Sequence, residues 1–169
     1  HLQVAELDGN SSWDLVVADQ DRVQLLFSRT PAIGTTVPLR SLEISAASEK
    51  ALATDINNDG FLDIVAASDS GLSISTGAPA GWSPPVAVSE AGSDVPNCIA
   101  GDSNEDGLIE LVVSPKAGQG NGEAKQLAQA TTKGGFLQVR IRGRNDDNGG
   151  GRVNHFGIGT TLEVWVDGR

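Results

Sequence analysis

Residues 55–67 read Asp-Ile-Asn-Asn-Asp-Gly-Phe-Leu-Asp-Ile-Val-Ala-Ala. The first nine residues form an acidic segment rich in turn formers, and an apolar run typical of a buried strand follows at once. Related segments begin at Glu6 and Asp102, so the three starts are 49 and 47 residues apart. Self-similarity at such a period indicates a repeat architecture. Each repeat is expected to contain a strand, an acidic loop and a second strand.

The sequence between consecutive loops has room for four short strands. Apolar and β-branched runs alternate there with Gly, Pro, Asn and Asp turn residues. The expected strands are 14–18, 22–28, 35–44 and 50–54 in the first period, and 63–67, 71–76, 86–89 and 97–100 in the second. Four strands per repeat are typical of a propeller blade. We therefore expect an all-β fold with a partial β-propeller of three blades over residues 1–115.

Each acidic loop carries oxygen-bearing side chains at its positions 1, 3, 5 and 9. Calcium takes about 6–8 oxygen ligands, and a backbone carbonyl at position 7 can supply one more. The expected ligands are Glu6, Asp8, Asn10 and Asp14 in loop 6–14; Asp55, Asn57, Asp59, Asp63 and the carbonyl of Phe61 in loop 55–63; and Asp102, Asn104, Asp106, Glu110 and the carbonyl of Leu108 in loop 102–110. Gly60 and Gly107 occupy position 6, where the first loop has Ser11. We expect Ca²⁺ in the second and third loops, and weaker binding or none in the first.

Two other interpretations of the loops fit the sequence less well. An EF-hand opens in the same way but needs a bidentate Glu at position 12 and flanking helices, whereas position 12 here is Ala66 or Val113 and the flanks resemble strands. Asn-Asp-Gly clusters also form plain hairpin turns without a metal. The repetition of the oxygen positions in register favours the metal hypothesis.

Charge and composition restrict the partners. The net charge is −10, and residues 1–132 carry 18 acidic and 6 basic side chains. This balance argues against nucleic acid or an anionic membrane as the partner and is compatible with bound cations. Cys98 has no partner for an internal disulfide, and no segment approaches the roughly 18 apolar residues of a membrane span. Because the chain contains no methionine, we expect it to be a fragment of a longer protein or a processed product.

The loops and the Leu-Val-Val type of run after them resemble the FG-GAP/VCBS repeat of integrin-type propellers, over roughly residues 1–115. Of the literal repeat signature, Gly77-Ala78-Pro79 is present. The resemblance implies a propeller with calcium loops between strands. It also implies a secreted, periplasmic or cell-surface location.

The C-terminal part resembles the ASPIC/UnbV module, which typically follows such repeats in exported proteins such as cartilage acidic protein and bacterial relatives. The matching segments are 136–143, 154–159 and 161–168, with His155 where that family usually has Arg and Thr160 where it usually has Ala. We expect a linker at 116–133 and a truncated β module at 134–169.

Two functions are consistent with this sequence. The first is a calcium-binding extracellular scaffold for protein or glycan interaction or adhesion, in which the ions are structural. Three blades cannot close a ring of typically 4–8, so the rest of the parent chain would be needed. The second is a fragment of an exported polysaccharide hydrolase or lyase. The chain has two histidines and neither a Gly-x-Ser-x-Gly nor a His-Glu-x-x-His motif, so we expect no enzyme, no catalytic residue and no cofactor besides Ca²⁺. A dockerin-like pairing module would instead require helices beside the loops.

Overall fold

The computed structural model describes residues 1–19, 22–28, 40–45, 48–91, 97–115 and 123–127, together with Val139 and Leu162. The chain divides into two units, His1–Phe136 and Leu137–Arg169. All the strands described below lie in the first unit. In the second unit only Val139 and Leu162 are described, so the module expected at 134–169 lies almost entirely outside the described residues.

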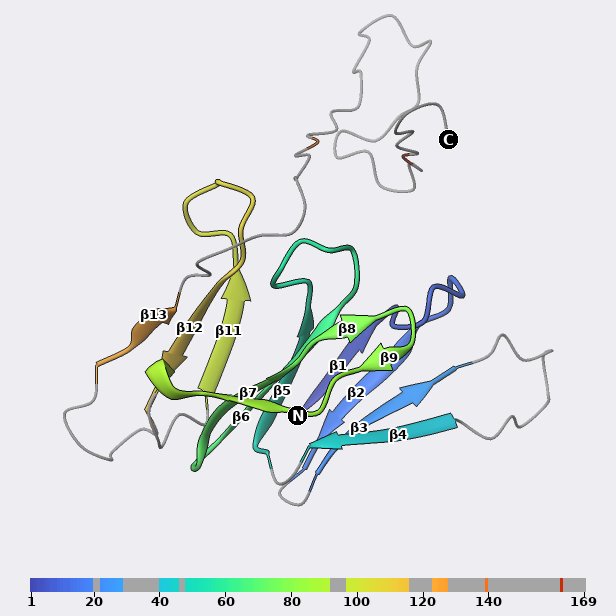
Figure 1. Ribbon diagram of the computed structural model, residues 1–169, viewed down its shortest axis with the longest axis horizontal. Helices are drawn as coiled ribbons and strands as arrows, with labels where there is room; N and C mark the ends of the chain where they lie inside the picture. Colours follow the sequence, from blue (N-terminus) through green and yellow to red (C-terminus); the bar gives the residue numbers. More distant parts are fainter. Residues whose placement is uncertain are drawn as a thin grey trace, which may run out of the picture. The chain divides into compact units, whose positions relative to one another are not determined.

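The first sheet is an antiparallel meander of four strands (Figure 1). Its strands, in spatial and chain order, are β1 (Leu2–Ala5), β2 (Asp14–Ala18), β3 (Val23–Phe27) and β4 (Arg40–Ser45). A register shift between Val23 and Gln24 marks a bulge where β3 meets β4.

The second sheet has the order β5-β6-β7-β10 and carries a small hairpin inserted before its last strand. The strands are β5 (Lys50–Thr54), β6 (Asp63–Ser68), β7 (Gly71–Ser75) and β10 (Val86–Val88), and the hairpin consists of β8 (Gly77–Ala78) and β9 (Gly81–Trp82). A 3-10 turn, η1 (Ser89–Ala91), follows β10.

The third sheet contains three strands among the described residues. They are β11 (Asn97–Gly101), β12 (Glu110–Ser114) and β13 (Lys125–Leu127), all antiparallel. β13 lies inside residues 116–133, the expected linker, and pairs with β12 through Leu127, Gln126 and Lys125.

The expected all-β, partial-propeller fold is confirmed, although the sheets begin one strand earlier than the loop-to-loop period suggested. The strand at Lys50–Thr54, counted as the last of the first period, opens the second sheet by pairing with β6. β11 opens the third sheet in the same way. The physical reason is that each acidic loop is a tight connection, so the strands on its two sides pair with each other. In the part of the chain that the structure describes there is no α-helix, and therefore none long and apolar enough to cross a membrane.

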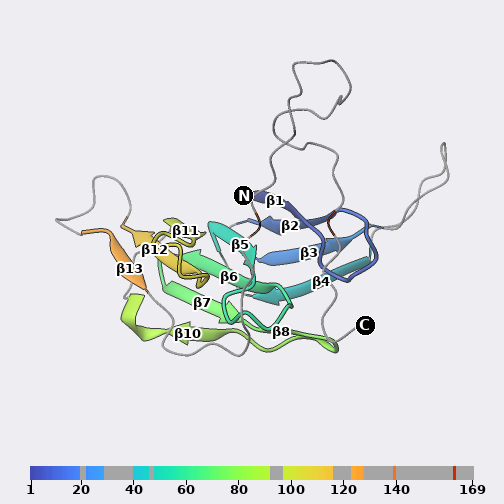
Figure 2. The same ribbon diagram turned by 90° about the horizontal axis from the view of Figure 1, so that it is seen from above.

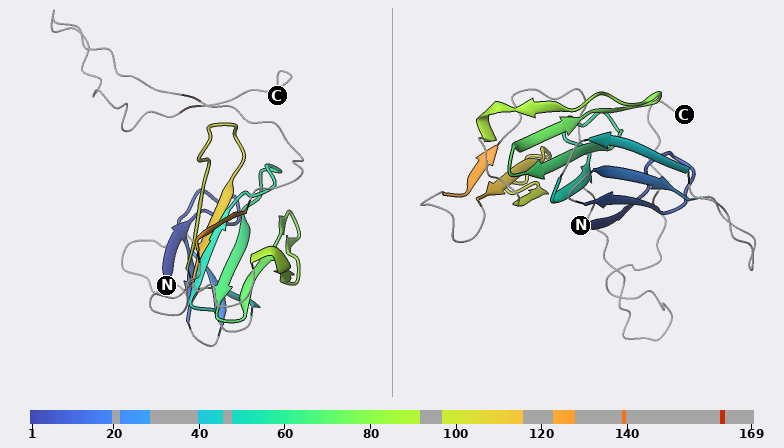
Figure 3. Two further views of the ribbon diagram at one scale, coloured as in Figure 1. Left: turned by 90° about the vertical axis from the view of Figure 1, so that its left-hand side faces the viewer. Right: turned by 90° about the horizontal axis from the view of Figure 1, so that it is seen from below.

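The second sheet lies between the other two (Figure 2), and Figure 3 gives two further views of the stack. One hydrophobic cluster joins the first and second sheets and contains Val16, Leu25, Ile64 and Ala66. The other cluster joins the second and third sheets and includes Val65, Ala67, Leu111 and Val113. Alternate residues of β6 point to opposite clusters, which explains why its first five residues are all buried.

Gln3 connects the first two sheets through its side-chain amide. Its Oε1 accepts a hydrogen bond from the Ala53 amide at 2.7 Å, and its Nε2 donates to the Ala53 carbonyl at 3.2 Å. β5 pairs on one side only, with β6, so the amide of Gln3 satisfies backbone groups on the other edge of that strand.

We predict that Gln3→Ala lowers the free energy of unfolding by about 1–3 kcal/mol, because it leaves partly buried backbone groups of Ala53 without this partner. The measurement is urea unfolding followed by circular dichroism. Gln24→Ala on β3 is the control, since Gln24 alternates with Val23 and Leu25 and faces away from the second sheet. An equal loss of stability in both variants would contradict the prediction.

Candidate metal centre

The three acidic loops join the first strand of each sheet to the second. They are residues 6–13 between β1 and β2, residues 55–62 between β5 and β6, and residues 102–109 between β11 and β12. Figure 1 shows all three at the same end of the sheets. With Glu6, Asp55 and Asp102 as position 1, position 9 is the first residue of the second strand in each sheet.

The three loops share one backbone conformation. Positions 4 and 6 are left-handed in every loop, with φ values of 74° and 63° at Gly9 and Ser11, 54° and 88° at Asn58 and Gly60, and 62° and 83° at Glu105 and Gly107. The first loop lacks the glycine at position 6 but has one at position 4. The first loop therefore has its glycine at position 4 instead of position 6, but its backbone follows the same course as in the other two loops.

In the second loop the side chains at positions 1, 3 and 5 curl inward and accept backbone hydrogen bonds. The Asp59 amide donates to Asp55 Oδ1 at 3.1 Å and to Asn57 Oδ1 at 3.0 Å, and the Gly60 amide donates to Asp55 Oδ2 at 2.9 Å. The Phe61 amide donates to Asp59 Oδ1 at 3.0 Å. These bonds hold the predicted ligand oxygens on the inner side of the turn.

The third loop repeats this pattern. The Asp106 amide donates to Asp102 Oδ1 at 3.1 Å and to Asn104 Oδ1 at 2.9 Å, and the Gly107 amide donates to Asp102 Oδ2 at 2.9 Å. The Leu108 amide donates to Asp106 Oδ1 at 2.8 Å. Asn104 also donates from Nδ2 to Asp106 Oδ2 at 2.9 Å, which fixes the orientation of both side chains.

The first loop forms most of this arrangement with a longer side chain at position 1. The Asn10 amide donates to Glu6 Oε1 at 2.9 Å and to Asp8 Oδ1 at 3.3 Å. Asn10 Oδ1 accepts from the Ser12 amide at 2.7 Å, and Asn10 Nδ2 donates to the Ser28 carbonyl at 3.2 Å. The longer Glu6 therefore takes the place of an aspartate without disturbing the turn.

The acid at position 9 is buried in every loop, with 0%, 0% and 3% of Asp14, Asp63 and Glu110 exposed. Asp63 Oδ2 accepts from the Ile56 amide at 3.0 Å, and Asp63 Oδ1 accepts from the Gly77 amide at 2.8 Å. The pKa of Asp63 is raised, mainly because burial removes water from the carboxylate. The two backbone hydrogen bonds oppose that shift, and the charges of Asp59 and Asp55 add to it.

The other two acids at position 9 play a similar part. Asp14 Oδ2 accepts from the Leu7 amide at 2.9 Å, and Asp14 Oδ1 accepts from the Ser28 amide at 2.8 Å. Glu110 Oε2 accepts from the amide and the hydroxyl of Ser103 at 2.8 and 2.7 Å. Position 9 therefore ties the start of each loop to the second strand, and in the first two sheets also to the segment after the third strand.

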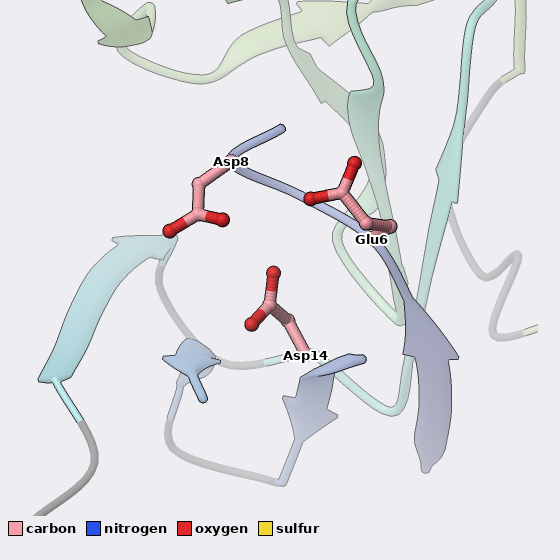
Figure 4. A group of neighbouring side chains, drawn as sticks. All are labelled: Glu6, Asp8 and Asp14. Atoms are coloured by element: carbon pink, nitrogen blue, oxygen red, sulfur yellow. The ribbon is translucent and has the colours of Figure 1, made fainter. Parts of the chain in front are cut away.

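The first and third loops each bring three of their own carboxylates together. One carboxylate oxygen from each of Glu6, Asp8 and Asp14 lies within 4.8 Å of the other two, and Figure 4 shows the three groups pointing toward a common centre. Asp102, Asp106 and Glu110 form the matching group in the third loop. Among the described residues, the three carboxylates of the second loop do not form such a group, although the charges of Asp55 and Asp59 act on Asp63. The first loop, expected to be the weakest, thus has one of the two tightest groups.

The donor set fits a hard cation. Positions 1, 3, 5 and 9 offer only carboxylate and amide oxygens, and none of the three loops contains a His or Cys. Oxygen donors of this kind suit calcium, whereas soft thiolate or imidazole ligands select zinc or copper. Phe61 and Leu108, the predicted carbonyl donors, lie at position 7 and anchor the carboxylate at position 5 through their amides.

Sequence reasoning missed several residues that shape the loops: Ser28, Asn58, Gly77 and Ser103. Gly77 lies in the Gly-Ala-Pro segment noted in the sequence, and a Cβ at this position would collide with the carbonyl oxygen of Leu62. That oxygen also accepts a hydrogen bond from Trp82 Nε1 at 2.8 Å. Because residue 77 is a glycine, its amide can approach Asp63 closely. The Gly-Ala-Pro segment was the one feature of the sequence that could have indicated this role of Gly77.

Comparison with protein families identifies the central part of this arrangement. Residues 55–113 match the FG-GAP-like repeat. The matched region contains the second and third loops and the strands from β6 to β11 in full. No curated protein and no solved structure matches the chain. The FG-GAP-like match does not extend to residues 134–169, so the ASPIC/UnbV resemblance stays a prediction.

The left-handed conformation of Glu105 provides a test of the loop geometry. Glu105 is exposed and has a φ of 62°, which typically costs a residue with a Cβ about 1–2 kcal/mol. Glycine removes this cost, but its greater freedom in the unfolded state offsets part of the gain. We therefore predict that Glu105→Gly raises the free energy of unfolding of the metal-free chain by about 0.5–1 kcal/mol, measured by urea unfolding. Glu105→Ala is the control, because it removes the same charge and keeps the Cβ. An equal gain from alanine would show that charge, and not backbone strain, is responsible.

Proposed function

We propose that this chain is a calcium-binding propeller module of a secreted, periplasmic or cell-surface protein, in which the ions have a structural role. The observation that carries the proposal is the convergence of three carboxylates in the first loop and again in the third, within an FG-GAP-like architecture. A calcium ion would neutralise carboxylates that otherwise repel one another, and would tie the loop to the strands on both sides. In each loop the ligands would be the side-chain oxygens at positions 1, 3, 5 and 9, joined in the second and third loops by the carbonyls of Phe61 and Leu108 at position 7.

We further propose that the module is a scaffold for protein or glycan interaction and has no catalytic activity of its own. The side chains at the predicted ligand positions already have defined roles in holding the loops. This supports a structural use of the acidic groups over acid–base catalysis.

The two outer sheets expose apolar faces that suggest a larger assembly. Leu2 and Val4 on β1 are 61% and 54% exposed, whereas Ala51 and Ala53, their equivalents 49 residues later, are buried against the first sheet. Ile99 on β11 is 59% exposed, whereas its equivalent Leu52 packs against the cluster shared with the third sheet. We propose that further blades of the parent chain cover both faces.

Calcium titration of the metal-free chain by isothermal titration calorimetry tests the proposed function. We expect binding with dissociation constants on the order of 10⁻⁴–10⁻³ M, the range of extracellular modules. Asp106→Asn should abolish or strongly weaken one site. Glu105→Gln removes the same formal charge from the same loop at a position that is not a ligand, and should retain that site. Absence of calcium binding, or an equal loss in both variants, would refute the proposal.

A further inference from the structure

The second loop is in direct contact with the third sheet. Ile56, at position 2, is 8% exposed and belongs to the cluster that contains Cys98, Leu111 and Val113 of the third sheet. Asn57, a predicted ligand, is 6% exposed, whereas Asn104 at the same position of the third loop is exposed. The third sheet therefore covers part of the second loop.

A hydrogen bond connects the second and third loops. Asn58 Nδ2, at position 4 of the second loop, donates to the carbonyl of Gly107, at position 6 of the third, at 2.8 Å. The next amide in the chain, that of Leu108, donates to Asp106 Oδ1 at 2.8 Å. One peptide group thus accepts from the second loop on one side and holds a predicted ligand of the third loop on the other.

Asn58 is also fixed from its own side. It lies between Asn57 and Asp59, two predicted ligands that are joined by the hydrogen bond from the Asp59 amide to Asn57 Oδ1. Its left-handed backbone, with a φ of 54°, is a conformation that Asn tolerates better than most residues. An ion that orders Asn57 and Asp59 therefore orders Asn58 as well.

We propose that the second and third loops bind calcium cooperatively, and that the side chain of Asn58 couples them. This inference rests on the proposed function and concerns its regulation. Ordering of either loop by an ion fixes the Asn58–Gly107 contact, so the second ion meets a loop that has already lost part of its conformational freedom. The coupling is reciprocal, as any coupling of two binding equilibria must be.

No corresponding side-chain contact can form between the first loop and the second. Position 4 of the first loop is Gly9, which has no side chain. The molecule thus contains an internal reference. Asn58→Gly reproduces the residue of the first loop at that position, and glycine adopts positive φ without strain.

The test is a calcium titration of the whole chain followed by NMR, with the amide protons of Gly60 and Gly107 as reporters of the second and third loops. Both amides donate to the aspartate at position 1 of their own loop, at 2.9 Å. The second loop is disabled by Asp55→Asn with Asp59→Asn. This variant leaves a formal loop charge of −1 on Asp63, equal to that of the filled native loop, where three carboxylates and one Ca²⁺ give −3 + 2 = −1. Electrostatic effects of the second loop on the third are thereby matched.

With Asn58 present, we expect the disabled second loop to weaken calcium binding at Gly107 about fivefold or more. In the Asn58→Gly background we expect the same change to have an effect of less than about twofold. Asn58→Asp, which keeps the shape of the side chain but has no N–H donor, should also remove the coupling. Equal effects with and without Asn58, or no effect in either background, would overturn the proposal while leaving calcium binding intact. If neither amide shifted in about 10 mM calcium, well above the affinity range of extracellular modules, both this inference and the proposed function would fail.

Discussion

Asp63→Ala is expected to destabilise the metal-free chain by about 2–5 kcal/mol. Asp63 is fully buried and accepts the amides of Ile56 and Gly77, so its removal leaves two buried N–H groups without a partner. Each such group typically costs about 1–3 kcal/mol. Relief of the unfavourable burial that raises the pKa of Asp63 offsets part of this loss. The measurement is urea unfolding in the presence of a chelator, which excludes any contribution from bound calcium.

The matched control is Asp59→Asn, in the same loop. The Phe61 amide donates to Asp59 Oδ1, and an asparagine oxygen can accept that hydrogen bond as well. We expect this variant to change stability by less than about 1 kcal/mol under the same conditions. If the two variants lost equal stability, position 9 would have no special structural role.

The sequence indicated those features of the fold and of the loops that depend on local patterns. The period and the alternation of apolar residues predicted β2 as Asp14–Ala18 and β5 as Lys50–Thr54, with the bounds that the structure has. These strands follow local rules, because their buried residues alternate along a single sheet. The sequence also located the four oxygen positions of each loop, which the structure places on one turn.

What the sequence did not indicate depends on contacts between distant segments. The dual acceptor role of Asp63 requires the Gly77 amide, 14 residues away, and the link through Asn58 requires a loop 49 residues away. Ser11 stands at position 6 of the first loop, where the second and third loops have glycine. The backbone shows that Gly9 at position 4 relieves the other left-handed site of the same turn. A motif compared position by position does not detect such an exchange.

Calcium itself is expected to have the largest effect on stability. A ligand that binds only the folded state stabilises it by RT ln(1 + [L]/Kd), which is about 2.7 kcal/mol per site at one hundred times Kd. Two filled loops would then contribute about 5 kcal/mol and raise the melting temperature by on the order of 10–20 °C. Thermal unfolding with calcium and with a chelator measures this difference.

Two variants separate specific binding from general charge neutralisation in that experiment. Asp106→Asn should lose more than half of the calcium-dependent gain, because it removes a ligand of the third loop and, through the proposed coupling, also weakens binding in the second. Glu105→Gln should keep nearly all of the gain. Magnesium at the same concentration and ionic strength should give a much smaller gain, since its strict octahedral geometry at about 2.0–2.1 Å suits a flexible acidic loop poorly. An equal gain with both metals, unaffected by Asp106→Asn, would mean that the cations only screen the acidic surface. The expected result is different: Glu105→Gln keeps the calcium-dependent gain in stability, and Asp106→Asn loses a large part of it. That result would locate this part of the stabilisation at the carboxylates that converge in the third loop.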